Sequence, residues 1–146
     1  MSANKVISVS TSMNAGCQVH ADIRGHKVII DQPTQAGGTD EGPTPLEFFL
    51  FSLGGCIASI ARIAATQQKI EMRSIDIDVD GTMNPAGLLG RPTEDRVGFQ
   101  TITVSAKIDA DLSEAEKQKF FEEVCHRCPL DDNIALETKV THSLIQ

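Results

Sequence analysis

Residues 44–69 read TPLEFFLFSLGGCIASIARIAATQQK and predict one long, strongly apolar helix. Thr44 is a suitable N-cap, Pro45 suits the first helical position, and Glu47 lies three residues after the cap, which together make a capping box. Over residues 46–65 the apolar run is interrupted only by Glu47, Ser52, Ser59 and Arg62. A helix that is apolar on every side belongs in a protein interior. We therefore expect the rest of the chain to wrap around a buried central helix.

Cys56 lies midway along this predicted helix. At about 100° per residue, Ser52, Cys56, Ser59 and Ile63 fall on one face. Two interpretations are open. Free cysteines are common small core residues. Alternatively the thiol is reactive, which requires a nearby cation or a helix N-terminus, because burial alone raises a thiol pKa.

Length, charge and cysteine content narrow the class of protein. The 146 residues suit a single domain, residues 1–146, and the net charge of −7 without a basic block argues against nucleic acid and anionic membranes as partners. The start, MSANKVISVS, does not resemble a signal peptide. Glu47, Arg62 and a glycine pair make the apolar run too short and too broken for a membrane span. Four cysteines without a secretion signal indicate a cytoplasmic protein, where cysteines are more often catalytic, metal-binding or redox-active than structural.

The remaining chain predicts strands on both sides of the central helix. The segment SIDIDVD, residues 74–80, alternates apolar and acidic residues, as a half-buried strand does. Ser113 and Glu116 form a second capping box, which predicts a helix to about His126. The order strands, helix, strands, helix, strand indicates an α+β fold. The predicted strands are a meander at 5–12, 17–23 and 26–31, a hairpin at 74–80 and 96–109, and a last strand at 139–145.

Cys128 is a second candidate thiol. It is followed by Pro-Leu-Asp-Asp, which is typical of a helix start with proline at the first position. The Cys128 sulfur should then lie at a helix N-cap, where the helix dipole lowers a thiol pKa. The alternative is that the proline and the acids only begin a helix.

Cys125 and Cys128 form a Cys-x-x-Cys motif that fits no familiar cofactor. A thioredoxin-like motif follows a strand, whereas this one follows a predicted helix. A structural zinc site needs four ligands, but the other cysteines and the histidines are scattered, so zinc remains a minor hypothesis. Haem attachment requires a histidine directly after the second cysteine. We predict no cofactor and no metal ligands.

Residues 37–56 (GGTDEGPTPLEFFLFSLGGC) and 128–132 (CPLDD) resemble the OsmC/Ohr superfamily, the osmotically inducible and organic hydroperoxide resistance proteins. The likeness extends over nearly the whole chain and includes the order of the elements. It implies an α+β fold in which antiparallel sheets pack against a long central helix. It also implies an intertwined homodimer with two sites at the subunit interface.

The resemblance further implies a cytoplasmic, cysteine-based peroxidase of the oxidative stress response. By its motif, Cys56 attacks an organic hydroperoxide and Cys128 resolves the sulfenic acid as a disulfide, which a dithiol, lipoyl-type in some members, then reduces. Phe48, Phe49, Phe51 and Ile60 are candidates for an apolar hydroperoxide pocket.

In the family's peroxidases an early arginine activates the thiol, held by an acid directly after the helix-start proline. In this chain Leu46 follows Pro45 and the acid comes one residue later, at Glu47, whose alternative role is the capping box. Arg24 is the candidate cation, with Arg62 as its alternative. This departure indicates a divergent branch and keeps open a second hypothesis, a non-enzymatic redox sensor or small-ligand binder.

Overall fold

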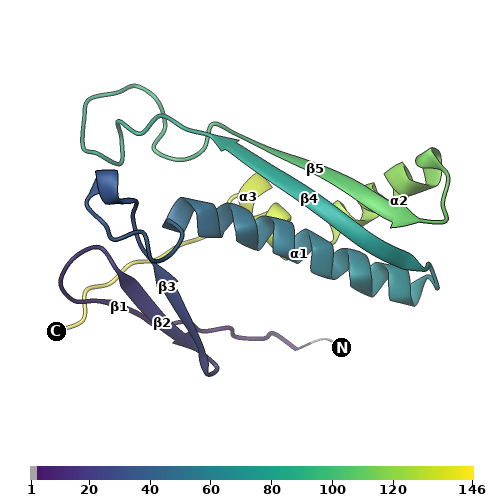
Figure 1. Cartoon of the computed structure of the whole chain (residues 1–146), viewed down its shortest axis with the longest axis horizontal. Helices are drawn as coiled ribbons and strands as arrows, with labels where there is room; N and C mark the ends of the chain where they lie inside the picture. Colours follow the sequence, from purple (N-terminus) through teal and green to yellow (C-terminus); the bar gives the residue numbers. More distant parts are fainter. Residues whose placement is uncertain (1–2) are drawn as a thin grey trace. The chain divides into compact units, whose positions relative to one another are not determined.

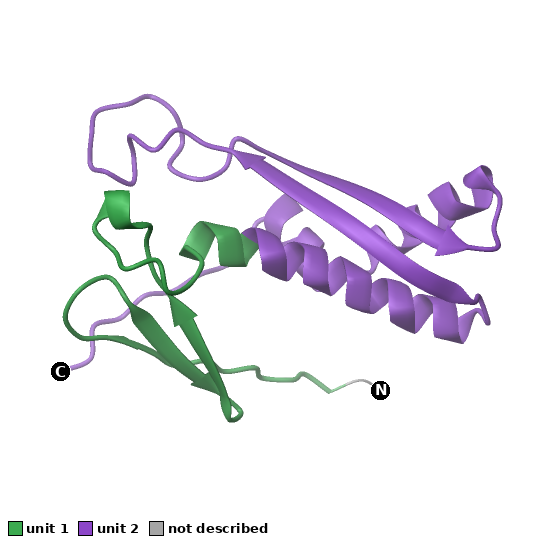
Figure 2. Cartoon of the chain, in the orientation of Figure 1, with its two compact units in different colours: residues 1–49 green, residues 50–146 purple. Residues whose placement is uncertain are grey.

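The computed structural model describes residues 3–146. The chain divides into two compact units, the first ending at Phe49 and the second beginning at Leu50 (Figure 2). The boundary falls within one helix, α1 (Pro45–Gln67), so no break in secondary structure separates the units. Each unit is described by itself. The prediction of a single domain over residues 1–146 is not tested by this division.

The first unit holds an antiparallel sheet in the order β1-β2-β3, with strands Thr11–Met13, Val19–Ile23 and His26–Ile30 (Figure 1). The predicted meander is therefore confirmed. Arg24 and Gly25, both at positive φ (54° and 89°), make the two-residue turn between β2 and β3, as a tight hairpin of right-twisted strands requires. The first strand is much shorter than predicted, because residues 5–10 pair with no strand within the described chain.

The predicted start of α1 is confirmed by both hydrogen bonds of a capping box. The Thr44 N–H donates to Glu47 Oε1 at 2.8 Å, and the Glu47 N–H donates to Thr44 Oγ1 at 3.2 Å. These bonds satisfy backbone groups that have no partner inside the helix.

The prediction that α1 is buried on every side is wrong for the single chain. One face alone is buried, made by Leu53, Ile57, Ala61, Ala64 and Ala65. Phe51 is 70% exposed and Ile63 46%, and Ser52 and Ser59 are also exposed. The apolar composition predicts a helix that is covered on all sides, but the described part of the chain packs against only one of its faces.

By length and composition α1 also meets the criterion for a membrane span, with 23 residues and a mean hydropathy of 1.8, so the expectation that it is too short is wrong. This is weak evidence for a span, since the core helix of a soluble protein meets the same criterion.

The second unit is built on a long antiparallel hairpin of β4 (Met72–Thr82) and β5 (Thr101–Ala110), which confirms the predicted pair (Figure 1). β5 begins at Thr101 rather than at residue 96, and residues 83–100 form the connection. The register shifts between Met72 and Ser74, which makes Arg73 an extra residue. This bulge lets buried Met72 and partly buried Ile75, three positions apart, pack in the same core.

Two short helices complete the second unit. α2 (Glu114–His126) begins at the predicted capping box of Ser113 and Glu116, and α3 (Pro129–Ala135) follows directly. Their inner residues join α1 and the hairpin in one core, whose buried members are Leu53, Ile57, Ala61, Ala64, Ala65, Met72, Ile108, Ala110, Phe120, Val124 and Cys128.

The last predicted strand, residues 139–145, is not formed within the described chain. Its apolar side chains are almost fully exposed, with Leu144 at 92% and Ile145 at 90%. At the other end of the chain, Val6 and Ile7 are exposed by 87% and 80%. A strand needs a hydrogen-bonding neighbour. Both terminal segments have strand-forming sequences, but within residues 3–146 neither is paired with a neighbouring strand.

Candidate functional site

Cys56 and Cys128 lie together in the core of the second unit, close enough for the Cys56 sulfur to raise the pKa of Cys128. Cys56 comes from the middle of α1, and Cys128 from the junction of α2 and α3. The helix approaches the hairpin closely because Gly54 has no side chain: a Cβ there would lie 3.2 Å from Val79 Cγ2. The packing of α1 on β4 therefore helps to set the position of Cys56.

Cys128 is the N-cap of α3, as the Cys-Pro motif predicts. Its backbone is extended (φ −81°, ψ 114°), and its Sγ accepts a hydrogen bond from the Asp131 N–H at 3.4 Å. The predicted lowering of its pKa is nevertheless wrong. Burial, with 1% of the residue exposed, and the neighbouring Cys56 sulfur raise the pKa of Cys128 to about 11. The backbone N–H groups of the helix start lower it, but by less than burial raises it.

The two thiols are therefore not equivalent. Cys128 keeps its proton at neutral pH and can donate it to the Cys56 sulfur, while Cys56 is only partly buried. Cys56 is the more accessible residue of the two, and Cys128 is its fully buried neighbour. This arrangement suits a pair in which the accessible thiol is oxidised first and the buried thiol then forms a disulfide with it.

Arg24 and Glu47, the other two predicted site residues, belong to the first unit. Arg24 is an exposed residue of the β2–β3 turn. Glu47 is held in the capping box, where the Thr44 N–H and then the Thr44 hydroxyl lower the pKa of its carboxyl. In the second unit Arg62, the alternative cation, donates from Nη1 to the Met72 carbonyl oxygen at 2.6 Å. The structure thus brings the two thiols together and gives Glu47 and Arg62 hydrogen bonds of their own.

Cys125 is a third thiol beside this pair, and the sequence analysis assigned it no function. It is partly buried at the C-terminal end of α2 and packs against the core cluster that contains Cys128. Burial, and then the charge of Asp131, raise the pKa of the Cys125 thiol. In the sequence, the feature that points to Cys125 is its position three residues before Cys128, in the Cys-x-x-Cys motif.

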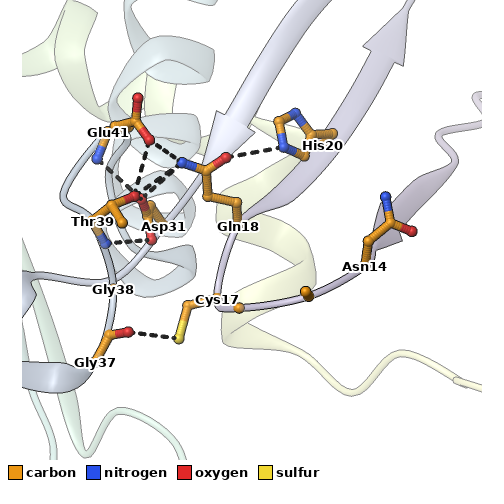
Figure 3. Close-up of a pocket in the computed structure, with 11 residues that line it drawn as sticks. Asn14, Cys17, Gln18, His20, Asp31, Gly37, Gly38, Thr39 and Glu41 are labelled. Atoms are coloured by element: carbon orange, nitrogen blue, oxygen red, sulfur yellow. Dashed lines mark hydrogen bonds between the residues drawn. The ribbon is translucent and has the colours of Figure 1, made fainter.

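The first unit contains a separate cavity of about 270 Å³ between the β1–β2 loop and the loop after β3 (Figure 3). Beneath it lies Asp31, which is fully buried. Its carboxylate accepts hydrogen bonds from the Thr39 hydroxyl at 2.7 Å, the Gln32 N–H at 2.7 Å and the Glu41 N–H at 3.1 Å. Mainly through the Thr39 hydroxyl, the pKa of Asp31 lies well below its usual range. No pattern in the sequence indicates this site, since its donors converge on Asp31 only after folding.

This cavity and the thiol pair use different residues. Cys17 lines the cavity and donates from Sγ to the Gly37 carbonyl oxygen at 3.5 Å, whereas none of Arg24, Glu47, Cys56 and Cys128 lines it. A second cavity of about 330 Å³ lies between β5 and α2 in the second unit. Neither includes the apolar residues predicted to form a hydroperoxide pocket. Within residues 3–146 no group of three or more His, Cys, Asp or Glu residues is placed to hold a metal ion.

Known structures show the same fold. An OsmC-like protein from Mycoplasma pneumoniae is 22% identical with a TM-score of 0.78, and the match covers 91% of this chain and 89% of that one. An organic hydroperoxide resistance protein from Legionella pneumophila is 19% identical with a TM-score of 0.63, covering 90% and 91%. The organic hydroperoxide resistance protein OhrB of Bacillus subtilis is 19% identical with a TM-score of 0.57, covering 88% and 89%.

No curated protein matches the sequence. A family model described as OsmC-like protein, however, matches residues 38–143, a range that includes Cys56, Cys125 and Cys128. This range covers α1, the hairpin and both short helices. The chain therefore belongs to the family of OsmC-like proteins, as its sequence motifs predict.

Proposed function

We propose that this protein is a thiol-dependent peroxidase that reduces organic hydroperoxides. The observation that carries the proposal is the pairing of Cys56 and Cys128, which come from distant parts of the sequence and lie together in one core, where Cys56 raises the pKa of Cys128. Proteins of similar fold from Legionella pneumophila and Bacillus subtilis are named organic hydroperoxide resistance proteins. That name supports the substrate class, and the thiol pair supports the chemistry.

The proposed reaction has three balanced steps. The Cys56 thiolate attacks the terminal oxygen of ROOH, so that the O–O bond breaks, an S–O bond forms and the alkoxide leaves as the alcohol after taking a proton. The Cys128 sulfur then attacks the Cys56 sulfenic sulfur as its thiol loses its proton, so that the S–O bond breaks, the S–S bond forms and the departing hydroxide takes that proton to leave as water. A dithiol finally donates two electrons and two protons, which restores both thiols and leaves the reductant as a disulfide. Dithiols of lipoyl type are the proposed reductants.

The assignment of roles follows from exposure and protonation. Cys56 is the more accessible thiol, and a hydroperoxide must reach the sulfur that it oxidises. Cys128 is buried and protonated, so it can stabilise negative charge on Cys56 by donating its S–H. After oxidation the same contact places Cys128 beside the sulfenic sulfur.

For the activating cation we propose Arg24, on the family resemblance, with Glu47 as its acidic partner. Arg62 is the weaker candidate because its guanidinium donates to the Met72 carbonyl. Replacing Glu47 should affect helix formation as well as catalysis, since its carboxylate accepts the Thr44 N–H in the capping box. Glu47→Gln is the informative variant, because an amide oxygen preserves the cap while it removes the charge.

We further propose an intertwined homodimer. Large apolar side chains on α1 remain exposed in the single chain, among them Phe49 at 44%, Phe51 at 70% and Ile63 at 46%. Exposed apolar surface of this kind indicates an interface. The two unpaired terminal segments have strand-forming sequences, and a second copy would give them neighbours. The proposed assembly is cytoplasmic, and at a net charge of −7 we assign it no nucleic-acid or membrane partner.

The test is steady-state turnover of cumene hydroperoxide with dihydrolipoamide. We expect turnover by the wild type, none by Cys56→Ser, and a single oxidation without turnover by Cys128→Ser, whose sulfenic acid dimedone would trap. Cys17→Ser is the matched control, because it removes a free thiol that lines the cavity of the first unit. Full activity in Cys56→Ser, or none in the wild type, would reject the proposal.

A second candidate function is a non-enzymatic redox sensor or small-ligand binder. The capping-box bonds of Glu47 favour it, because this carboxylate already has a structural role. Such a protein would form the Cys56–Cys128 disulfide under oxidants without turning over hydroperoxide. The rate at which one equivalent of hydroperoxide oxidises Cys56, compared with a free thiol of ordinary pKa, about 8.5, separates the two functions.

A further inference from the structure

We propose that Cys125 is a third redox thiol, which takes over the disulfide from Cys56 by exchange at Cys128 before the external dithiol reduces it. The inference rests on the proposed function and adds a residue to it. A thiol on α2 would thereby connect the Cys56–Cys128 pair to the reductant.

The backbone turn keeps the Cα atoms of Cys125 and Cys128 within the range that a disulfide can span. The Cys128 N–H donates to the Cys125 carbonyl oxygen at 3.2 Å, which closes a turn over His126 and Arg127. Residues three apart in a closed turn have Cα atoms within roughly 7 Å. Disulfides join Cα atoms about 4.4–6.8 Å apart. A Cys125–Cys128 disulfide therefore requires side-chain rotation and no rearrangement of the helices.

Cys128 has one thiol neighbour in the core, Cys56, and a second three residues earlier in the chain, Cys125. Cys56 approaches from α1 and Cys125 from the last turn of α2, and both pack against the cluster in which Cys128 is buried. A sulfur with two neighbouring thiols can exchange one disulfide partner for the other. The exchange itself needs no further oxidant.

The step balances as an ordinary thiol–disulfide exchange. The Cys125 thiolate attacks the Cys128 sulfur of the Cys56–Cys128 disulfide, the new bond forms, the old one breaks, and Cys56 leaves as a thiolate. Cys56 is then ready for a second hydroperoxide. The dithiol reduces the Cys125–Cys128 disulfide by two electrons and two protons.

Access explains why such a transfer would help. Cys128 is 1% exposed, so a dithiol cannot attack its sulfur directly. Cys56 lies on α1, whose uncovered side is closed by a second copy in the proposed homodimer. Cys125 is partly buried at the end of a different helix. Moving the disulfide to Cys125 shifts it away from α1.

The pairing can be tested without peroxidase activity. The Cys56→Ser protein is equilibrated with oxidised and reduced glutathione, alkylated, and mapped by mass spectrometry. We expect an intramolecular Cys125–Cys128 disulfide, absent from the Cys56→Ser/Cys125→Ser control, with the fold of both checked by circular dichroism. Glutathione adducts or free thiols at both positions would overturn the proposal.

Kinetics test the role in turnover. Without Cys125 the dithiol has to attack the less accessible Cys56–Cys128 disulfide, so we expect Cys125→Ser to lower kcat/KM for the dithiol by about tenfold. A structural defect would lower kcat/KM for the hydroperoxide equally, whereas loss of the exchange would not. Cys17→Ser should match the wild type. Equal dithiol kinetics in Cys125→Ser and the wild type would contradict the relay. If the wild type has no peroxidase activity, the proposed function fails, and glutathione mapping still decides the pairing.

Discussion

Arg62 in α1 donates a hydrogen bond from Nη1 to the carbonyl oxygen of Met72, the first residue of β4, at 2.6 Å. The bond links the helix to the strand that follows it. Met72 lies beside the bulge at Arg73, where the regular ladder to β5 is interrupted. Arg62 therefore supplies a donor where the strand pairing is irregular.

Replacing Arg62 with Ala should lower the free energy of unfolding by about 1–2 kcal/mol, because a charge-assisted hydrogen bond is lost. Urea denaturation measures this. Arg24→Asn is the matched control: it removes the turn cation, and asparagine tolerates the positive φ of this position. We expect Arg24→Asn to leave stability within about 0.5 kcal/mol of the wild type and to slow oxidation of Cys56. If Arg62→Ala slowed the oxidation of Cys56 and Arg24→Asn did not, Arg62 would be the activating cation instead.

The raised pKa of Cys128 makes stability sensitive to alkaline pH. Its pKa is about 11 in the folded protein, above the value of about 8.5 for a free thiol. The folded state thus holds the proton more tightly than the unfolded state, and this contribution is complete below about pH 8.5 and is lost as the pH rises towards 11. Urea midpoints at pH 8 and pH 10.5 should differ more for the wild type than for Cys128→Ala. An equal alkaline loss in both proteins would contradict the raised pKa.

Asp31 should govern acid stability in the opposite direction. Its pKa is lowered, chiefly by the Thr39 hydroxyl, so its contribution is present above the unfolded pKa of about 3.9 and is lost as the pH falls below it. Asp31→Asn should be less stable than the wild type at pH 7 and lose less stability on acidification. Hydrogen exchange in β2 and β3 measures this, with Asp40→Asn, a change at an exposed loop residue, as the control.

Gly54 and Gly55 form a natural pair for testing the packing of α1. A Cβ at Gly54 would meet Val79 Cγ2 at 3.2 Å, whereas a Cβ at Gly55 has no atom within 4 Å in the described chain. Gly55→Ala should raise the free energy of unfolding by about 0.5–1 kcal/mol through helix propensity. Gly54→Ala should lower it by about 1 kcal/mol, since crowding outweighs that gain. Equal effects would mean that α1 does not pack on β4 as described.

Much of this fold was predictable because its signals are local. Both capping boxes, at Thr44 and at Ser113, are complete within four residues, and the alternation of residues 74–80 needs no distant partner. The turn at Arg24 and Gly25 is equally local. These features appear where the sequence predicts them.

The failures share a dependence on distant parts of the chain. The pKa of Cys128 follows from burial by other elements, which outweighs the local helix start. The terminal segments have the composition of strands, but strand formation depends on a neighbour that the sequence cannot specify. The meeting of Cys56 with Cys128 was expected from family resemblance, since no local pattern joins them.

The bulge at Arg73 bears on which insertions and deletions β4 can tolerate. Beyond it, β4 directs Ile75, Ile77 and Val79 towards the core, while the acidic residues between them face outward. Losing or gaining one codon between Ser74 and Val79 would exchange the two faces of the strand beyond the change. Loss of Arg73 alone would instead restore a regular ladder, because Met72 and Ser74 already pair with the neighbouring residues Ala110 and Asp109. Point substitutions at the outward positions leave the faces as they are. We expect natural variants of this strand to differ by substitution and to keep its length constant.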